Sequence, residues 1–448
     1  MTKFKLTLLL SALFFFQNVQ AQQEMGLHSM TDVWNVNQTN PAFMPNYKFV
    51  VGLPSVRDNL YMTGPTFGDF LVEKDGETFI DFNQAIGEME EGKNIIRNDF
   101  QIQTLSFAFR INNLMLSLGH TGRAFTLAQY NKVLPQVVYQ GNAQFVGETI
   151  DLSNQFVLNS FNEYALGAAY KIGKITIGAK AKYLSGFRSA ATDKDQNSAT
   201  LYTDPDIYQI TLDSDYRLNS SGTVDFNGFD EFDIRFDVNE TGNEFFTENT
   251  GWAFDLGATF EVTEKLTVSA SILDIGSIEW KEDTRNYTSQ GTYTYEGLDI
   301  SEALTGGDED PEFGNPLDTL ESIFRTTETN DSYTVDLPTK FYLSGQYQAT
   351  EKLAIGAAFF AEKFRNNTFQ ALSINGRYQV LKQLTLGANY TTLLETDKNF
   401  NIGVNAAIKV GPVQIFGTTD NVISLINQDD AQYFSARFGV NLLLGELE

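Results

Sequence analysis

The sequence predicts an all-β chain that forms a transmembrane antiparallel β-barrel of about fourteen strands. Three observations indicate this fold: apolar and polar residues alternate over many segments, the segments are about 9–11 residues long, and very short turns join them in pairs. Alternation gives a strand one apolar and one polar face. A tilted strand needs about 9–11 residues to cross a bilayer. A soluble sandwich also alternates, so strand length and turn spacing favour the barrel.

Alternation is most regular in two segments, Trp252–Val262 and the last strand, Tyr433–Leu444. In the first, one face carries Trp252, Phe254, Leu256, Ala258, Phe260 and Val262. Aromatic residues near the ends of the apolar faces are typical of the girdles at membrane interfaces. They are Tyr164, Tyr170, Trp252, Tyr347, Tyr378, Tyr390 and Tyr433.

Short turns predict six hairpins. These are Leu105–Ile111 with Leu114–His120, Tyr164–Ile172 with Ile175–Leu184, Trp252–Val262 with Leu266–Asp274, Phe341–Ala349 with Leu353–Ala361, Phe369–Val380 with Leu384–Leu393, and Phe400–Lys409 with Val413–Thr418. A first strand at Tyr47–Leu53 and the last one bring the number to fourteen, which is even, as in single-chain bacterial barrels. The predicted barrel domain is 47–448.

The composition excludes several other classes of protein. The chain has 448 residues, 13% aromatics and no Cys, which argues against a disordered chain, a disulfide scaffold and thiolate metal sites. Its 31 Lys and Arg against 57 Asp and Glu give a net charge of -26, which argues against a nucleic-acid partner.

Residues 1–21 resemble a secretory signal peptide. Lys3 and Lys5 precede an apolar run from Leu6 to Phe16, and Val19-Gln20-Ala21 is a small-residue cleavage site. An uncleaved anchor is the alternative, but the run is shorter than the roughly 20 residues that span a bilayer. The protein is therefore expected in the cell outer membrane. Both termini then lie on the short-turn side, which is the periplasm in such barrels.

The long connections, at about 55–100, 121–163, 185–251, 275–337 and 419–432, lie on the other side. Two of them are strongly acidic, with 14 acids in 185–250 and 15 in 279–336. Alternation persists in the first, so some barrel strands are expected to continue beyond the membrane as a hairpin. Asp193, Asp195 and Asn197 have the spacing of a calcium loop. However, Ser198 replaces the turn glycine and Asp204 the bidentate Glu, so a solvated surface is the simpler interpretation.

The N-terminal segment, 22–46, is predicted to be a hatch inside the barrel. A fourteen-stranded barrel needs filling, because eight strands are already wide enough to hold their own side chains. The alternative is a disordered periplasmic tail. Candidate hatch and lumen residues are apolar, or belong to the Asn-Pro-Ala element before the first strand. They are Met30, Trp34, Asn40, Pro41, Phe43 and Met44.

Catalysis is not expected. The two histidines, His28 and His120, lack the context of a nucleophile elbow, and the chain has no Gly-rich phosphate loop or other cofactor motif. We therefore predict no enzyme activity, no cofactor and no catalytic residue.

Two stretches carry a family resemblance. Asn40-Pro41-Ala42 resembles the element found in FadL-type long-chain fatty-acid transporters, and the PorV and PorP/SprF groups are similar there. The stretch 271–280 (SILDIGSIEW), with the opening Gly26-Leu27-His28, looks most like an uncharacterised Bacteroidota family of outer-membrane barrels. The resemblance covers essentially the whole mature chain. It implies a fourteen-stranded barrel with an N-terminal hatch.

Two functions remain open. The first is passive, FadL-like transport of a small hydrophobic molecule, with an apolar pocket beside the hatch. The second is a structural or accessory subunit of an outer-membrane assembly for secretion, gliding or barrel insertion, with the acidic loops as docking surfaces. The partners implied are outer-membrane lipid and either a small ligand or other outer-membrane proteins. A continuous cavity between hatch and wall would favour transport.

Overall fold

The computed structural model describes residues 24–74, 76–226, 232–234, 245–295, 326–394, 401–427 and 431–447. The predicted signal peptide and part of the second acidic loop lie outside these residues. Among the described residues, no helix is long and apolar enough to span a membrane.

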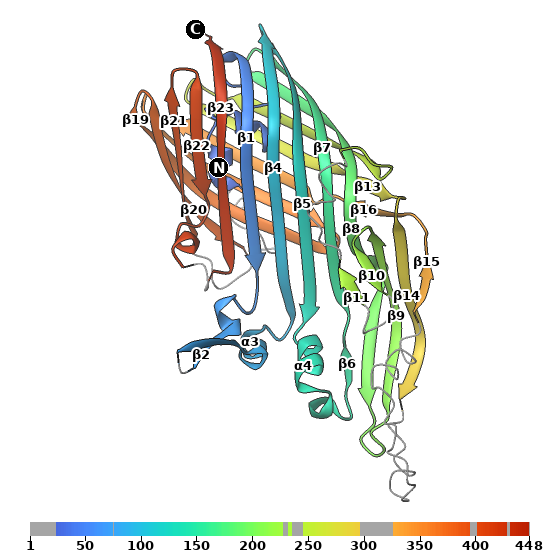
Figure 1. The fold of residues 1–448 in the computed structure, drawn as a ribbon. Coiled ribbons are helices and arrows are strands. Elements are labelled where there is room, and N and C mark those ends of the chain that lie inside the picture. The colour runs from blue at the N-terminus through green and yellow to red at the C-terminus, as the bar shows by residue number, and fades with distance from the viewer. Residues whose placement is uncertain are drawn as a thin grey trace, which may run out of the picture.

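Fourteen antiparallel strands form a closed ring, as predicted (Figure 1). In ring order they are β1 (Tyr47–Met62), β4 (Lys93–Ile111), β5 (Leu114–Asn131), β7 (Asn154–Ile172), β8 (Ile175–Thr203), β12 (Thr250–Glu261), β13 (Leu266–Trp280), β17 (Thr339–Gln348), β18 (Leu353–Phe364), β19 (Asn367–Leu381), β20 (Leu384–Leu393), β21 (Asn401–Val410), β22 (Val413–Thr419) and β23 (Tyr433–Glu446). β23 pairs with β1 from Tyr47↔Glu446 to Tyr61↔Tyr433, which closes the barrel.

The exterior of the barrel is apolar, as a lipid-facing wall requires. Outward residues of β12, such as Trp252, Phe254 and Leu256, are about half exposed, while the alternate residues Ala253 and Asp255 are buried. Six of the seven girdle aromatics point outward as expected. Tyr433 is the exception: it is buried in the lumen, where its hydroxyl accepts a hydrogen bond from Asn59.

Several strands are longer than alternation predicted, and bulges explain the difference. The register shifts between Gly52 and Ser55 on β1, at Thr104 on β4, at Phe187 on β8, and near Asp274 on β13. A bulge reverses which residues of a strand face inward. The predicted strands therefore stop or start at these points, although the real ones continue.

Short turns gather at one end of the barrel, with the C-terminus, and we call this the short-turn end (Figure 1). The opposite, long-loop end carries the remaining elements. They are η3 (Gly68–Phe70), β2 (Leu71–Lys74), β3 (Glu77–Ile80), α3 (Phe82–Glu88), α4 (Val133–Gln140), η4 (Ala143–Phe145), β6 (Thr149–Asp151), β9 (Ile210–Ser221), β10 (Val224–Phe226), β11 (Phe232–Ile234), β14 (Thr284–Tyr295), β15 (Thr327–Thr329), β16 (Tyr333–Asp336) and η6 (Ile423–Leu425).

A sheet projects beyond the barrel at the long-loop end, as the alternation in 185–251 predicted (Figure 1). β8 continues for 29 residues and pairs with β9, which in turn pairs with β14 along its whole length. The acidic loops therefore contribute an ordered sheet as well as connections.

Leu256 tests the lipid-facing wall, because it is 52% exposed on the outer face of β12. Leu256→Arg should lower the free energy of unfolding in lipid bilayers by about 2–4 kcal/mol if the residue lies near the bilayer midplane. The control is Leu425→Arg on η6, which is outside the strands and should be nearly neutral. Equal effects of the two substitutions would contradict the assignment of this face.

Candidate functional site

Residues 24–46 lie inside the barrel, and we call them the luminal segment. The segment contains α2 (Met25–Ser29) and η2 (Trp34–Gln38), and every residue of α2 is buried. α2 packs against the inner faces of β18 to β22. These short helices have few backbone bonds of their own, so contacts with the barrel wall hold the segment in place.

The start of the segment is anchored by charge and by one close approach. The Glu24 carboxylate lies 3.5 Å from Arg57 on β1 and 2.7 Å from Arg437 on β23. The backbone N–H of Gly26 donates to the buried carboxylate of Asp420, over 2.7 Å. A Cβ on residue 26 would lie only 2.3 Å from the Thr418 hydroxyl oxygen, so only glycine allows α2 to approach the wall this closely.

His28 is held by hydrogen bonds on both ring nitrogens. Nδ1 lies 2.8 Å from the hydroxyl of Thr39, and Nε2 lies 2.9 Å from that of Ser344 on β17. Because the Thr39 hydroxyl donates to a backbone carbonyl, we assign the proton to Nδ1, and Nε2 accepts from Ser344. The ring stacks on Tyr342 at 4.8 Å. Burial lowers the pKa of His28 to about 4, so the imidazole is neutral at pH 7.

The Asn-Pro-Ala element joins the segment to the opposite part of the wall. The Asn40 amide donates to the backbone carbonyls of Ala258 on β12 and Ala270 on β13, at 3.3 and 3.2 Å. Its oxygen accepts from the N–H of Ala42, which closes a local turn. The Asn40 side chain thus stabilises a turn of the segment and hydrogen-bonds the segment to two strands.

Glycines on the wall accommodate this element. A Cβ on Gly257 would lie 2.1 Å from the Asn40 side-chain oxygen, and a Cβ on Gly178 would lie 2.4 Å from the backbone of Pro41. Larger residues at these two positions would push the segment away from β8 and β12. This packing gives the Asn-Pro-Ala element a structural role.

Buried ion pairs continue from the segment across the lumen. In order of contact the chain of pairs runs through Arg437, Glu24, Arg57, Asp99, Lys340 and Asp274. Asp99 is on β4 and Lys340 is on β17, six strands apart in a ring of fourteen. Their 3.2 Å contact therefore joins nearly opposite walls.

Asp274, the last residue of this chain of ion pairs, contacts three cations. Its carboxylate accepts two hydrogen bonds from Arg123, both at 3.0 Å, lies 2.6 Å from Lys182 and lies 3.3 Å from Lys340. Its backbone φ is +59°, a left-handed conformation at the bulge of β13. The bulge aims the carboxylate at three cations on three other strands.

An apolar core fills the lumen toward the long-loop end, among the strands from β4 to β19. Its members come from facing walls: Phe125 of β5 meets Phe364 of β18 edge-on, with ring centroids 5.0 Å apart. The core comprises Ile95, Phe125, Leu127, Val157, Phe161, Leu184, Ala191, Ala253, Ile278, Trp280, Val335, Leu337, Phe364 and Phe369. Tight packing closes this part of the lumen.

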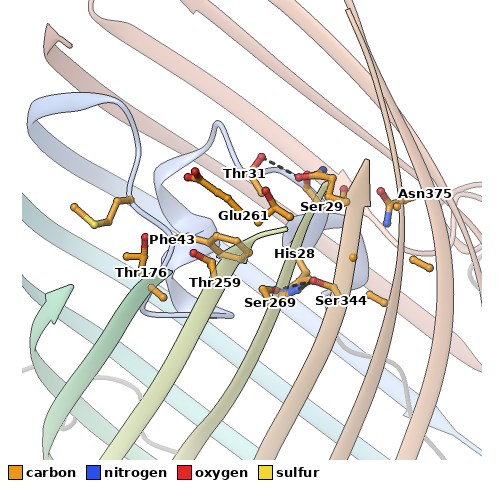
Figure 2. A pocket seen from close by; sticks show the side chains of 18 of the residues that line it. His28, Ser29, Thr31, Phe43, Thr176, Thr259, Glu261, Ser269, Ser344 and Asn375 are labelled. Carbon is orange, nitrogen blue, oxygen red and sulfur yellow. Dashed lines mark hydrogen bonds between the residues drawn. The ribbon is translucent and has the colours of Figure 1, made fainter. Parts of the chain in front are cut away.

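A cavity of about 360 Å³ separates the luminal segment from the wall toward the short-turn end (Figure 2). His28 and Phe43 border it from the segment. Residues of eight strands line the opposite side: β4, β7, β8, β12, β13, β17, β18 and β19. At its mouth Lys171 pairs with Glu261 at 2.5 Å. The wall side chains carry mostly hydroxyl and amide groups, so the cavity can offer hydrogen bonds to a small molecule.

The structure places the six predicted hatch residues in one segment but in different environments. Met30 is buried against β21 and β22, and Trp34 packs against β1 and β4 and donates to the Ser106 hydroxyl over 2.9 Å. Asn40 and Pro41 contact the wall glycines. Phe43 and Met44 border the cavity.

Sequence reasoning missed the polar anchors Glu24, Gly26 and His28. No local pattern indicates them, because their partners on the barrel wall are 33 to 413 residues away in the chain. One signal in the sequence could have indicated an anchor: Glu24 is a charged residue close to the predicted cleavage site.

The residues with the spacing of a calcium loop do not form a calcium loop in the structure. Asp193, Asp195 and Asn197 lie along β8, where the carboxylate of Asp193 accepts hydrogen bonds from the backbone of Asp195 and Gln196. Within the described ranges, no three His, Asp or Glu side chains come together as potential metal ligands. The register between β8 and β9 shifts between Thr192 and Asn197, and the Asp193 carboxylate accepts hydrogen bonds from the backbone at this irregularity.

Asp274→Asn tests the ion-pair centre, because Asn keeps the size of the side chain and tolerates the left-handed backbone. The substitution should lower the free energy of unfolding by about 3–5 kcal/mol, since it removes the one carboxylate that contacts all three buried cations and leaves them with only Glu163, Asp255 and Asp99. Urea unfolding in lipid or detergent measures this. Asp195→Asn, in a pair with Lys194 in which both side chains are more than 70% exposed, should change stability by less than about 0.5 kcal/mol. A loss below about 1 kcal/mol in Asp274→Asn would refute the assigned role.

Acid should loosen the segment through His28. The docked pKa of about 4 lies below the ordinary value of 6.5, so docking is fully stabilised above pH 6.5 and loses about 3 kcal/mol as the pH falls to 4. Bilayer conductance measured between pH 7 and 4 should therefore rise more steeply in the wild type than in His28→Gln, which does not titrate. Identical pH profiles would rule out this contribution.

Among solved structures, the chain is similar to the toluene transporter TbuX of Ralstonia pickettii (10% identity, TM-score 0.45, covering 92% of this chain and 94% of that one). It is also similar to the toluene transporter TodX of P. putida (10%, 0.42, 91% and 91%) and a FadL homologue of Pseudomonas aeruginosa (11%, 0.41, 89% and 90%). These low values carry no argument about ligand or mechanism.

No curated protein matches the chain. One family does match, over residues 41–420, which is most of the barrel. The chain belongs to the family of unknown function DUF5723.

Proposed function

We propose that the protein is a passive outer-membrane transporter for small molecules, with both termini periplasmic, and that the luminal segment is the hatch that closes it. The observation that carries this proposal is the cavity between the segment and eight strands of the wall. The hatch does not fill the lumen, and it leaves a site of the size that small molecules occupy.

A route past the hatch would run along β20 to β23 and β1. The apolar core lies among β4 to β19, whereas the buried inward residues around α2 on β20 to β23 and β1 are mostly polar, with Tyr61 and Tyr433 among the exceptions. These buried polar residues include Asn59, Asn389, Thr391, Asn401, Thr419, Asp420 and Ser435. Movement of α2 would join this polar side to the cavity without disturbing the apolar core.

The lining changes the kind of cargo that we propose. The resemblance to FadL-type transporters implied a hydrophobic molecule in an apolar pocket. The cavity instead combines the Phe43 ring and Met44 with hydroxyl and amide groups. We therefore propose a molecule that makes several hydrogen bonds, and not a hydrocarbon.

One observation favours the second candidate, an accessory subunit of an outer-membrane assembly. The β8–β9–β14 sheet extends far beyond the barrel, and a pure channel does not need it. Co-purification of the native protein with fixed partners, together with a barrel that stays closed without its hatch, would favour this role.

Removal of the hatch tests transport. Deletion of residues 22–43 should raise the conductance of reconstituted bilayers at least tenfold, because the side occupied by α2 then fills with water. Gly26→Val should give an intermediate increase, since its side chain displaces α2 from Thr418. Gly376→Val is the matched control, because a Cβ there meets no atom within 4 Å. A folded deletion variant that stays silent would contradict the proposal.

A further inference from the structure

Two rows of polar side chains cross the inner wall from strand to strand. The hydroxyl row follows paired residues: Thr176, Thr259, Ser269, Ser344, Ala358, Ser373, Thr391 and Asn401. The amide row lies beside it: Thr267, Gln346, Gly356, Asn375, Asn389 and Gly403. All of these residues face the lumen, because they are two residues apart on each strand.

The hydroxyl row also climbs from one end of the barrel to the other. Thr176 is the second residue of β8, next to its short turn. Asn401 is the first residue of β21, and the opposite end of that strand, Val410, makes the short turn with β22. The strands tilt, so a row perpendicular to them rises along the barrel. The row is therefore a polar track along the wall of the lumen, interrupted at Ala358.

The first half of this track lines the cavity, and α2 covers the second half. Thr176, Thr259, Ser269 and Ser344 all border the cavity, with Asn375 from the amide row (Figure 2). Ser373, Thr391 and Asn389 lie beyond it and are buried where α2 packs on β19 and β20. The cavity thus ends where the hatch helix begins to cover the rows.

Asparagine side chains lie flat on glycines of neighbouring strands. A Cβ on Gly403 would lie 2.4 Å from the amide oxygen of Asn389, and one on Gly356 would lie 3.0 Å from that of Asn375. Both amide oxygens are shielded and have no hydrogen-bond partner among the described residues. A buried acceptor without a hydrogen bond costs free energy, which indicates that a polar ligand or water donates a hydrogen bond to each of these oxygens.

The chemistry of the track favours a neutral ligand with many hydroxyl groups. Hydroxyl and amide side chains both donate and accept, so they suit a solute that does the same at each position. No charged side chain belongs to either row, and the Lys171–Glu261 pair at the mouth is already neutralised. The other charged residue of the cavity lining, Arg110, donates to the backbone carbonyls of Asn112 and Pro45. Phe43 offers a ring on the other side of the cavity, against which the C–H face of a sugar ring can pack.

We propose that the two rows form a binding track for a neutral polyhydroxylated solute, a sugar of one or two rings, which α2 interrupts in the closed state. This inference rests on the proposed function, because it names the cargo of the same lumen. The solute would bind first in the cavity and continue along Ser373 and Thr391 when the hatch moves.

The test uses the barrel without residues 22–43 in planar bilayers, with maltose as the probe. Maltose should reduce the ion conductance in a saturable way, and gluconate, an anion, should not compete with it. Ser269→Ala and Thr391→Val should each weaken this block about fivefold, the effect of one lost hydrogen bond. Thr392→Val is the matched control, because Thr392 is the neighbouring residue of β20 on the outer face.

The outcomes separate the two proposals. A hatchless barrel that conducts ions but is not blocked by maltose overturns the sugar track and leaves transport intact. Equal weakening by Thr391→Val and Thr392→Val overturns it as well. A folded hatchless barrel that conducts no ions overturns the proposed function itself.

Discussion

A closed ring of fourteen strands encloses more space than its own inward side chains can fill, and the rest of the structure follows from that constraint. The membrane requires closure, because lipid offers no partner for a free backbone edge. Closure creates a lumen, and this chain fills the lumen in three ways: an apolar core, a chain of buried ion pairs and its own N-terminal segment.

The three fillings differ in how easily they can move. The apolar core joins facing walls by tight packing, and Asp274 bridges three cations, so both are costly to break. The luminal segment is held by hydrogen bonds, by ion pairs at Glu24 and by the packing of Met25, Leu27 and Trp34 against the wall. Water can replace the polar contacts in part, and we therefore propose the segment as the movable element.

The strand pattern could be predicted from sequence because lipid imposes one apolar face on every strand. All fourteen strands were identified by this alternation. Their lengths were not, since bulges such as those at Thr104 and Asp274 reverse the alternation within a strand. Tyr433 was placed on the wrong face because aromatic residues serve both the girdle and the lumen.

The luminal site was harder to predict, because its partners are distant in the chain. The apolar residues of the segment, such as Trp34 and Phe43, were recognised by composition. The anchors Glu24, Gly26 and His28 depend on Arg57, Asp420 and Ser344, and strand register alone determines that these meet. The polar rows are visible only once the register is known, since each strand contributes one residue.

The central claim is that docking of the luminal segment on β22 keeps the lumen closed. The chain has no Cys, so Gly26→Cys with Thr418→Cys creates a single possible disulfide at the closest contact between α2 and the wall. Bilayer conductance of this variant, recorded before and after reduction, tests the claim most directly. We expect silent channels when the disulfide is formed and open ones after reduction, because the added side chains then crowd α2 away. The same conductance in both states would contradict the account.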